Sequence, residues 1–364
     1  MKIGIFTFFQ TNYGAVLQAF ALQHYLQQQP DTDVEIIDFT TPNHLLEHKV
    51  FRKQKTRNPI KFLAYYFFTL LRYKQLKARI NRTWEFKQRY FKYTRRYSTV
   101  DDVLNNYPQK DIYITGSDQV FNPNARYVPV YYLNFDKGDS KKVAYAPSFG
   151  ISQFTEEITR KISNYIKDFD FLSCRESAGA EYLSKLTGKR IPVVVDPVLL
   201  ISEKDWNNVA VKPKYNENYI FIYDLNGANN LIKIAKNIQK NTGLPIVCLT
   251  GNRMKIYPID KQVYDAGPAE FLGWIKNASY VVTDSFHGTM FSLIFKKQFF
   301  TFIALEKTSS RIRNILDKVA LNDRIITKNT LANFDFKKHS DIKEINYKSI
   351  VNDSKSYIKE FLSC

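Results

Sequence analysis

One histidine occurs at a place in the sequence where chemistry is possible. An apolar run at Tyr280–Val282 predicts a buried strand, and the apolar pattern after Thr289 predicts a helix. Between them lies a small polar turn that contains His287. Open α/β sheets bind ligands where their strands end, and the free N–H groups at a helix start attract anions. A histidine can hold or release a proton near neutral pH, so His287 is the best candidate for catalysis, although many histidines are structural.

Two other predicted strands also end in charged side chains. Thr115-Gly116-Ser117-Asp118-Gln119 follows one strand, and its carboxylate and amide could bind a sugar's hydroxyls or orient a catalytic group. Capping the next helix is the commoner role for an aspartate such as Asp118. Arg175 follows another strand and could grip a carboxylate or a phosphate with two N–H groups. The alternative for Arg175 is a surface ion pair with Glu176.

The elements that must position these residues follow a β-turn-α-β pattern from the start of the chain. Lys2–Phe8 predicts a buried strand, Ala15–Leu22 a helix, and Val34–Phe39 a second strand. Gly14, in the first turn, does not belong to a GxGxxG fingerprint. It is either a turn glycine or part of a backbone cradle for an anion.

The length of 364 residues exceeds what one core supports, so we expect two domains. The predicted fold is α/β, with two Rossmann-like domains facing a cleft and a basic aromatic helical insertion at about 44–97 in the first domain. We expect an N-terminal domain at 1–200, a C-terminal domain at 201–346 and a closing helix at 347–364.

The net charge of +18 predicts an anionic partner: a membrane surface, a nucleic acid or a phosphorylated substrate. Lys49–Arg96 holds sixteen Lys or Arg and one acid, Glu85, among many aromatic residues. Pro59–Arg72 predicts an amphipathic helix that could lie on an anionic membrane or pack on its own domain. We expect no nucleic acid partner, because no recognition motif accompanies the charge.

The three cysteines, Cys174, Cys248 and Cys364, are scattered and predict free thiols in a reducing compartment. The start of the chain reads as a strand and not as a signal peptide, and we expect no membrane-spanning helix. No Asp-x-Asp pair or His cluster predicts a metal site.

Several segments in order resemble the bacterial polysaccharide pyruvyl transferase family. The segments are the opening at Lys2–Leu22, TGSDQVFNP at Thr115–Pro123, AYAPSFG at Ala144–Gly150, SCRESAG at Ser173–Gly179, VVDPVLL at Val194–Leu200 and Glu270–Phe295, which contains SFHGT. The insertion at Lys49–Arg96 matches no family motif.

The resemblance implies a two-domain fold like that of GT-B glycosyltransferases. It also implies transfer of the enolpyruvyl group of phosphoenolpyruvate to a sugar, closing a pyruvyl ketal and releasing phosphate. The family's functional histidine and arginine correspond to His287 and Arg175, and a basic residue after the last strand corresponds loosely to Lys307 or Arg311.

We assign site residues on this basis. The expected catalytic residues are His287, Asp284, which could orient the imidazole, and Asp118. The expected phosphoenolpyruvate-binding residues are Arg175, Lys307, Arg311, Ser285, Gly288 and Thr289, and the expected acceptor-binding residues are Asn12, Tyr13, Gly14, Ser117 and Gln119.

The sequence therefore predicts an enzyme that uses phosphoenolpyruvate as donor, without cofactor or metal. Its acceptor would be a lipid-linked or cell-surface glycan precursor, as in capsule or exopolysaccharide synthesis. We expect a cytoplasmic protein on the inner face of the plasma membrane, attached through residues 49–96. The alternatives are a sugar-nucleotide glycosyltransferase of GT-B fold and a non-catalytic glycan- or membrane-binding protein.

Overall fold

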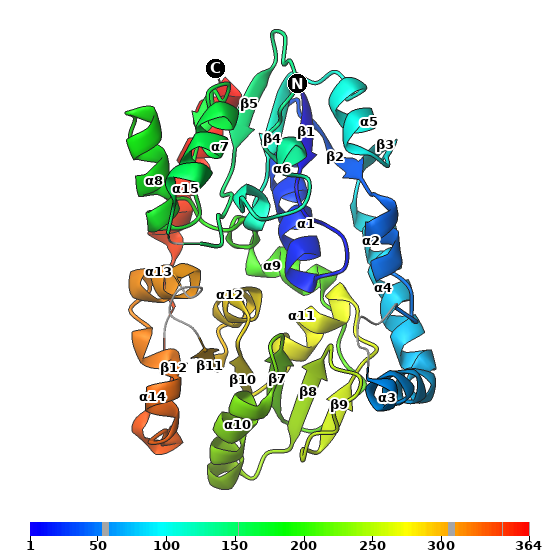
Figure 1. Cartoon of the computed structure of the whole chain (residues 1–364). Helices are drawn as coiled ribbons and strands as arrows, with labels where there is room; N and C mark the ends of the chain where they lie inside the picture. The colour runs from blue at the N-terminus through cyan, green and yellow to red at the C-terminus, as the bar shows by residue number, and fades with distance from the viewer. Residues whose placement is uncertain (53–57, 152, 305–309, 344, 364) are drawn as a thin grey trace.

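The computed structural model describes residues 1–52, 58–151, 153–304, 310–343 and 345–363. The chain forms two halves, one above the other, and each contains a six-stranded parallel sheet with helices around it (Figure 1). This arrangement confirms the predicted α/β fold with two Rossmann-like domains. The strands of the upper sheet lie between residues 2 and 172, and those of the lower sheet between 220 and 327. The domain boundaries at 200/201 and 346/347 stay predictions.

The two sheets have the same strand order. The upper sheet runs β3 (Tyr93–Tyr97), β2 (Asp33–Phe39), β1 (Lys2–Phe6), β4 (Ile112–Thr115), β5 (Lys141–Ala144) and β6 (Phe171–Leu172). The lower sheet runs β9 (Lys261–Val263), β8 (Ile246–Thr250), β7 (Ile220–Asp224), β10 (Tyr280–Thr283), β11 (Gln298–Ile303) and β12 (Ile325–Thr327). The order therefore reverses between β1 and β4 above and between β7 and β10 below, and ligands bind at such points in open parallel sheets.

Helices connect and cover these strands. In chain order they are α1 (Tyr13–Gln27), α2 (Pro42–Glu47), α3 (Pro59–Leu71), α4 (Tyr73–Tyr90), α5 (Val100–Asn105), α6 (Val128–Tyr131), α7 (Glu156–Ile166), α8 (Ser177–Thr187), α9 (Glu203–Val209), α10 (Asn229–Thr242), α11 (Pro268–Lys276), α12 (Phe286–Ile294), α13 (Ser310–Lys318), α14 (Lys328–Leu331) and α15 (Lys348–Ser363). Short 3₁₀ turns include η1 (Gln119–Phe121), η2 (Pro197–Leu199), η4 (Asn322–Arg324) and η5 (Phe336–Lys338).

The helices that follow β1 and β10 are buried along nearly their whole length. Helix α1 starts at a cap in which Asn12 Oδ1 accepts hydrogen bonds from the N–H groups of Gly14 and Ala15. Helix α12 starts at Ser285, whose hydroxyl accepts from the Gly288 N–H. Most residues of both helices are apolar or small, and the buried Gln18 and Gln23 of α1 donate hydrogen bonds to backbone carbonyls. This pattern is typical of helices enclosed by other elements. These two helices meet where the halves join.

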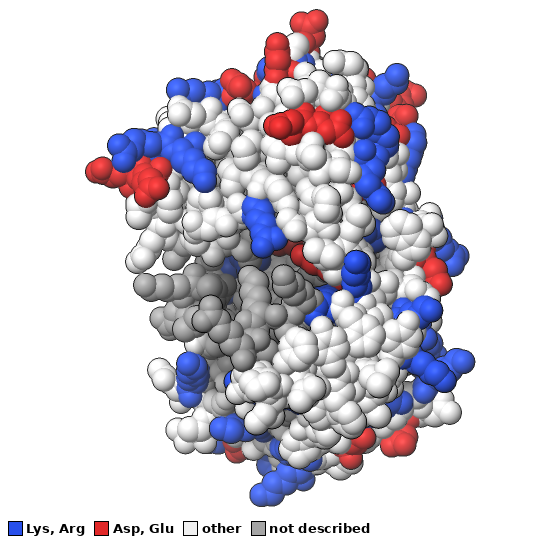
Figure 2. Space-filling view, turned by 45° about the vertical axis from the view of Figure 1, so that its right-hand side comes forward, with Lys and Arg blue, Asp and Glu red and all other residues white. Residues whose placement is uncertain are grey.

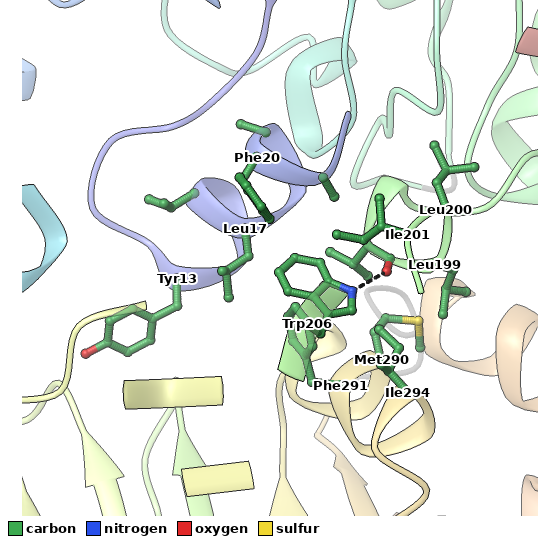
Figure 3. Packing of buried hydrophobic residues seen from close by; sticks show 14 of the residues in the cluster. Tyr13, Leu17, Phe20, Leu199, Leu200, Ile201, Trp206, Met290, Phe291 and Ile294 are labelled. Atoms are coloured by element: carbon green, nitrogen blue, oxygen red, sulfur yellow. Dashed lines mark hydrogen bonds between the residues drawn. The ribbon is translucent and has the colours of Figure 1, made fainter. Parts of the chain in front are cut away.

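One apolar core crosses the junction between the halves. Leu17 and Phe20 of α1 pack with Trp206 of α9 and with Phe291 of α12, as Figure 3 shows. The Trp206 indole is fully buried, and its N–H donates to the Val198 carbonyl at 3.0 Å. The two halves are therefore held by shared packing and not by a linker alone.

The closing helix α15 returns to the upper half (Figure 1). Ser354 Oγ accepts a hydrogen bond from the Val195 N–H, and the Tyr357 hydroxyl donates to the Ala144 carbonyl. Phe361 packs near Phe171 at the edge of the upper sheet. The chain thus crosses the junction a second time.

The basic insertion forms α3 and α4, so the predicted helix at Pro59–Arg72 is confirmed as α3, which ends at Leu71. Helix α4 runs along one side from the upper half to the lower half (Figure 1). Its Arg82 forms ion pairs with Asp265 at 2.8 Å and with Glu270 at 3.5 Å in the lower half. Within the described ranges, no helix has the length and apolar character needed to cross a bilayer.

Trp206→Ala should destabilise the whole chain. Removing a fully buried tryptophan leaves a cavity between the halves, and such changes cost about 3–5 kcal/mol of unfolding free energy. Urea unfolding followed by far-ultraviolet circular dichroism would measure this loss. Trp84→Ala is the matched control, because Trp84 is 45% exposed and should change the unfolding free energy by less than about 1 kcal/mol. Equal losses for both variants would contradict the shared core.

Candidate functional site

Three charged side chains from distant parts of the chain meet at the junction of the halves. Arg175 lies just after β6, Asp196 just before η2, and His287 in the first turn of α12. Arg175 Nη1 donates a hydrogen bond to Asp196 Oδ2, and His287 Nε2 lies 3.5 Å from the same oxygen. Sequence reasoning required Arg175 and His287 to face one site, and the structure brings them together through Asp196.

Ser117 completes this cluster from the end of β4. Its hydroxyl donates to Asp196 Oδ2 at 3.1 Å and accepts from Arg175 Nη1 at 3.2 Å. The side chains of Ser117, Arg175 and Asp196 are buried. Burial opposes the charge on Asp196, yet the nearby His287 and Arg175 outweigh it and hold the pKa of Asp196 below its usual range. Asp196 is therefore a carboxylate.

Arg175 keeps donors that nothing in the described chain uses. Its Nε and Nη2 atoms are buried and have no hydrogen-bond partner among the described residues. The Asp118 carboxylate lies 3.8 Å from Nη2, which is too long for a hydrogen bond. Leaving buried charged donors unpaired is costly, so their presence marks a place for an anionic ligand.

A second guanidinium lies near the first. Arg311 on α13 lies over one side of the Phe286 ring, 5.6 Å from its centre, and Arg175 is 4.7 Å from the same centre. Burial and then the positive charge of Arg175 lower the pKa of Arg311. An anion held between the two guanidinium groups would relieve this repulsion.

Asp118 has a strained backbone. Its φ is 73° and its ψ is −171°, a region that residues other than glycine seldom adopt. Its Oδ1 accepts from the Gln119 N–H at 2.8 Å, so it does cap η1 as the commoner role predicts. The strain costs about 1–3 kcal/mol and places the same carboxylate beside Arg175.

His287 touches the start of α1 in the other half. A Cβ atom added at Gly14 would lie 2.0 Å from Nδ1 of His287, so only glycine leaves room for the imidazole. Gly14 is thus a helix-start glycine that lies against His287, and its predicted role as a backbone cradle for an anion stays a prediction. His287 Nε2 is buried and has no hydrogen-bond partner among the described residues, and it faces Asp196 Oδ2 at 3.5 Å.

The carboxylate beside His287 is not the predicted Asp284. The two oxygens of Asp284 accept hydrogen bonds from the backbone N–H groups of Leu225 and Asn226, each at 3.0 Å. The helix starts at Phe286, one residue before His287, and its first turn directs the imidazole away from Asp284 toward Asp196. We therefore correct the assignment: Asp284 holds the loop after β7, and the carboxylate that lies beside His287 is Asp196.

The small residues around His287 serve the helix itself. Ser285 caps α12 through the Gly288 N–H, and a Cβ at Gly288 would lie 2.6 Å from Thr283 Oγ1. The Thr289 hydroxyl donates to the Ser285 carbonyl and pairs with Thr301 at 2.8 Å. All three were predicted to bind phosphoenolpyruvate. Their contacts correct this for Thr289, which is fully buried, and give Ser285 and Gly288 structural roles.

The predicted acceptor residues separate into two groups. Ser117 belongs to the charged cluster, and Gln119 lies beside it with Oε1 accepting from Asn122. Asn12 caps α1, so its Oδ1 is occupied. Tyr13 is buried in the junction, where its hydroxyl donates to the Ala266 carbonyl at 2.6 Å and its ring stacks on Phe271. Tyr13 is therefore a packing residue, which corrects its assignment to the acceptor.

Lys307 lies outside the described residues. In the part of the chain that is described, no three His, Cys, Asp or Glu side chains gather as a metal site would require. The expectation that the reaction needs no metal or cofactor stays a prediction. The cysteines Cys174 and Cys248 are free and buried.

Sequence reasoning missed two members of the site. Asp196 stands in the VVDPVLL segment, where an acid interrupts an apolar run. A buried charge needs partners, so this isolated acid was the available signal. The sequence places Phe286 in the turn, and the structure shows that both arginines lie against its ring. The predicted surface pair of Arg175 with Glu176 does not occur, because Glu176 is buried and accepts from the Phe149 N–H.

Comparison with solved structures finds the same fold in sugar-nucleotide epimerases. UDP-N-acetylglucosamine 2-epimerase from Rickettsia bellii superposes with a TM-score of 0.55 at 10% identity, covering 100% of this chain and 95% of that one. The UDP-GlcNAc 2-epimerase from Methanocaldococcus jannaschii gives 0.51 at 15% identity, covering 100% and 99%. That from Neisseria meningitidis gives 0.51 at 10% identity, with 100% of each chain covered. At these identities the likeness shows the fold alone, a two-domain GT-B-like architecture.

The comparison with curated protein sequences finds no match. The family model for polysaccharide pyruvyl transferase, in contrast, matches residues 12–304, which include the start of α1, the Asp118 turn, Arg175, Asp196 and His287. With most of its length matched, the chain belongs to the polysaccharide pyruvyl transferase family.

Proposed function

We propose that the protein transfers the enolpyruvyl group of phosphoenolpyruvate to a sugar and closes a pyruvyl ketal across two of its hydroxyls. The observation that carries this proposal is the buried Arg175, whose Nε and Nη2 donors lack partners among the described residues, beside His287. Phosphoenolpyruvate has a carboxylate and a phosphate, and guanidinium groups bind both in a two-pronged way. Arg175 and Arg311 together supply two positive charges for it.

The residues divide the proton transfers of this reaction. The first sugar hydroxyl adds to C2 of the enolpyruvyl group and loses its proton to Asp118, while C3 takes a proton from His287 and becomes a methyl group. The C2–O bond to phosphate then breaks, and phosphate leaves with the electron pair. The second hydroxyl adds to C2 and closes the ketal, and its proton balances the charge of the departing phosphate. Asp196 holds the imidazole in place throughout.

The acceptor we propose is a lipid-linked glycan precursor, met at the inner face of the plasma membrane. Helix α3 supports this, because Ile60, Leu63, Phe67, Leu70 and Leu71 are 64–76% exposed. Their spacing places them along one side of the helix. Lysines 61, 74 and 77 of the insertion are exposed too, so apolar insertion combines with attraction to anionic lipid.

His287→Ala should abolish turnover while the fold remains. Phosphate release from phosphoenolpyruvate is measured with a panel of lipid-linked galactose, glucose and N-acetylmannosamine acceptors. We expect release only with a suitable acceptor, and at least a 100-fold loss in the variant, since general acid–base catalysis contributes about 10²–10⁴-fold. His24→Ala, near the other end of α1, is the matched control. Full turnover in His287→Ala would refute the role. A product heavier by a whole sugar, and not by a pyruvyl group, would identify a glycosyltransferase.

Gly14→Ala should lower turnover without lowering stability. The new methyl group would overlap the imidazole of His287 and displace it from Asp196. Within a helix the same change normally stabilises by about 0.5–1 kcal/mol, so general unfolding is not expected. Turnover and urea unfolding measured on one preparation separate the two effects. Unchanged turnover would show that the contact between Gly14 and His287 does not matter to the reaction.

Phe67→Ser/Leu70→Ser should weaken membrane binding more than tenfold. Burying one large apolar side chain stabilises by about 1.5–3 kcal/mol, and this variant removes two from the exposed face of α3. Co-sedimentation with vesicles containing phosphatidylglycerol measures binding, and phosphatidylcholine vesicles should bind weakly. Val211→Ser is the control, since Val211 is exposed outside the insertion. Equal binding by both variants would contradict the role of α3.

A further inference from the structure

A polar cavity that the proposed chemistry does not use lies at the junction of the halves. We call it the basic pocket, a space of about 220 Å³ lined by residues from four segments. These are Thr11 and Asn12, the stretch 47–50 with Arg52, the α4 residues Leu76, Arg79, Ile80 and Thr83, and Gly251 with Arg253. It shares no lining residue with the cluster of Arg175, Asp196 and His287. One water occupies about 30 Å³, so the pocket has room for a larger group.

The charges around the basic pocket favour an anion. Lys49, Arg52, Arg79 and Arg253 line it, against one carboxylate, Glu47. Four positive charges and one negative charge leave a net charge of +3. The neighbouring His48 adds none at neutral pH, because burial, followed by the charges of Lys87 and Arg52, lowers its pKa to about 4. On the face drawn in Figure 2, several Lys and Arg side chains lie near the level where the halves meet, with Asp or Glu beside some of them.

The guanidinium groups of the pocket are held in place before any ligand arrives. Arg253 Nη1 donates to the Val50 carbonyl at 2.6 Å, and its guanidinium lies 5.2 Å from the centre of the Tyr65 ring. Arg79 lies 4.7 Å from the centre of the Tyr13 ring. Burial lowers the pKa of both Arg52 and Arg253, and neighbouring positive charges lower it further. Fixed, mutually repelling guanidinium groups are what a phosphate-binding site requires.

The basic pocket lies between the cluster around His287 and helix α3. Asn12 lines the pocket, and two residues later Gly14 touches His287, so the start of α1 separates the pocket from the site. On its other side, Tyr65 braces Arg253 from the buried face of α3, whose opposite face exposes apolar side chains. A ligand in the pocket could therefore extend a sugar toward His287, and its apolar chain would pass an end of α3 to reach the exposed apolar face.

We propose that the basic pocket binds the diphosphate of a lipid diphosphate, the group that would link a glycan acceptor to its lipid. The identification of the ligand as an acceptor rests on the proposed function, but the binding of a lipid diphosphate does not. Guanidinium groups and Lys49 neutralise the two phosphates, and α3 offers its apolar face to the chain.

Isothermal titration calorimetry on the full chain tests this with three probes: farnesyl diphosphate, inorganic pyrophosphate and UDP. We expect farnesyl diphosphate to bind at least tenfold more tightly than UDP. Lys49→Gln/Arg79→Gln should weaken farnesyl diphosphate and pyrophosphate binding at least tenfold. Phe67→Ser/Leu70→Ser should weaken farnesyl diphosphate binding and leave pyrophosphate binding within twofold.

Lys74→Gln/Lys77→Gln is the matched control for the pocket variant. It removes two exposed charges from α4, the helix that carries Arg79, at positions that do not line the pocket. If this control lost as much affinity for farnesyl diphosphate and pyrophosphate as the pocket variant, the effect would come from the overall positive charge and the proposal would be overturned. Tighter binding of UDP, or no binding of farnesyl diphosphate, would overturn it too. Thermal unfolding checks that each variant folds. If Lys49→Gln/Arg79→Gln does not fold, the single variant Lys49→Gln replaces it in the titrations.

Phosphoenolpyruvate titrations distinguish failure of this proposal from failure of the proposed function. The pocket variants should bind phosphoenolpyruvate as the unmodified chain does, since Arg175 and Arg311 lie outside the pocket. If the chain binds farnesyl diphosphate but does not turn over phosphoenolpyruvate, the proposed ligand of the pocket is supported and the proposed reaction is contradicted. If the pocket variants turn over lipid-linked acceptors as fast as the unmodified chain does, only the proposed role of the pocket is contradicted.

Discussion

The structure of the site depends on one buried carboxylate. Asp196 is removed from water, and a charge in that position persists only where positive groups and hydrogen-bond donors surround it. Arg175 and Ser117 approach it from the upper half and His287 from the lower half. The electrostatic requirement of one side chain thus brings residues from three loops, and from both halves of the chain, to one point. The shared apolar core around Trp206 then holds this geometry fixed.

The junction also brings together the ends of the strands at which each sheet reverses its order. The order of each sheet reverses between its first and fourth strands, and open parallel sheets bind ligands at such points. Helices α1 and α12 begin after strands at these two points. The cluster of Arg175, Asp196 and His287 and the basic pocket lie on either side of the start of α1. Helix α4 spans the halves beside them, and its Arg82 pairs with Asp265 below.

Much of this was readable in the sequence because the signals are local. Apolar runs followed by small polar turns located His287, Arg175 and Asp118 at strand ends, and the amphipathic pattern located α3. Contacts across the junction were not readable. Asp284 is near His287 along the chain, but the helix start directs the imidazole to Asp196, about ninety residues away. Tyr13 looked like a loop residue, yet its ring stacks on Phe271 of the lower half. Such pairings depend on how two domains stack, which no local pattern encodes.

The shared core has a consequence for how the enzyme works through its cycle. Many two-domain enzymes admit and release substrates by swinging their domains apart about a hinge. Here such a swing would pull Trp206 and Phe291 out of contact with α1 and expose apolar surface to water at each turnover. The α4 ion pairs and the returning α15 add further ties between the halves. The shared core therefore disfavours a hinge motion that separates the two halves.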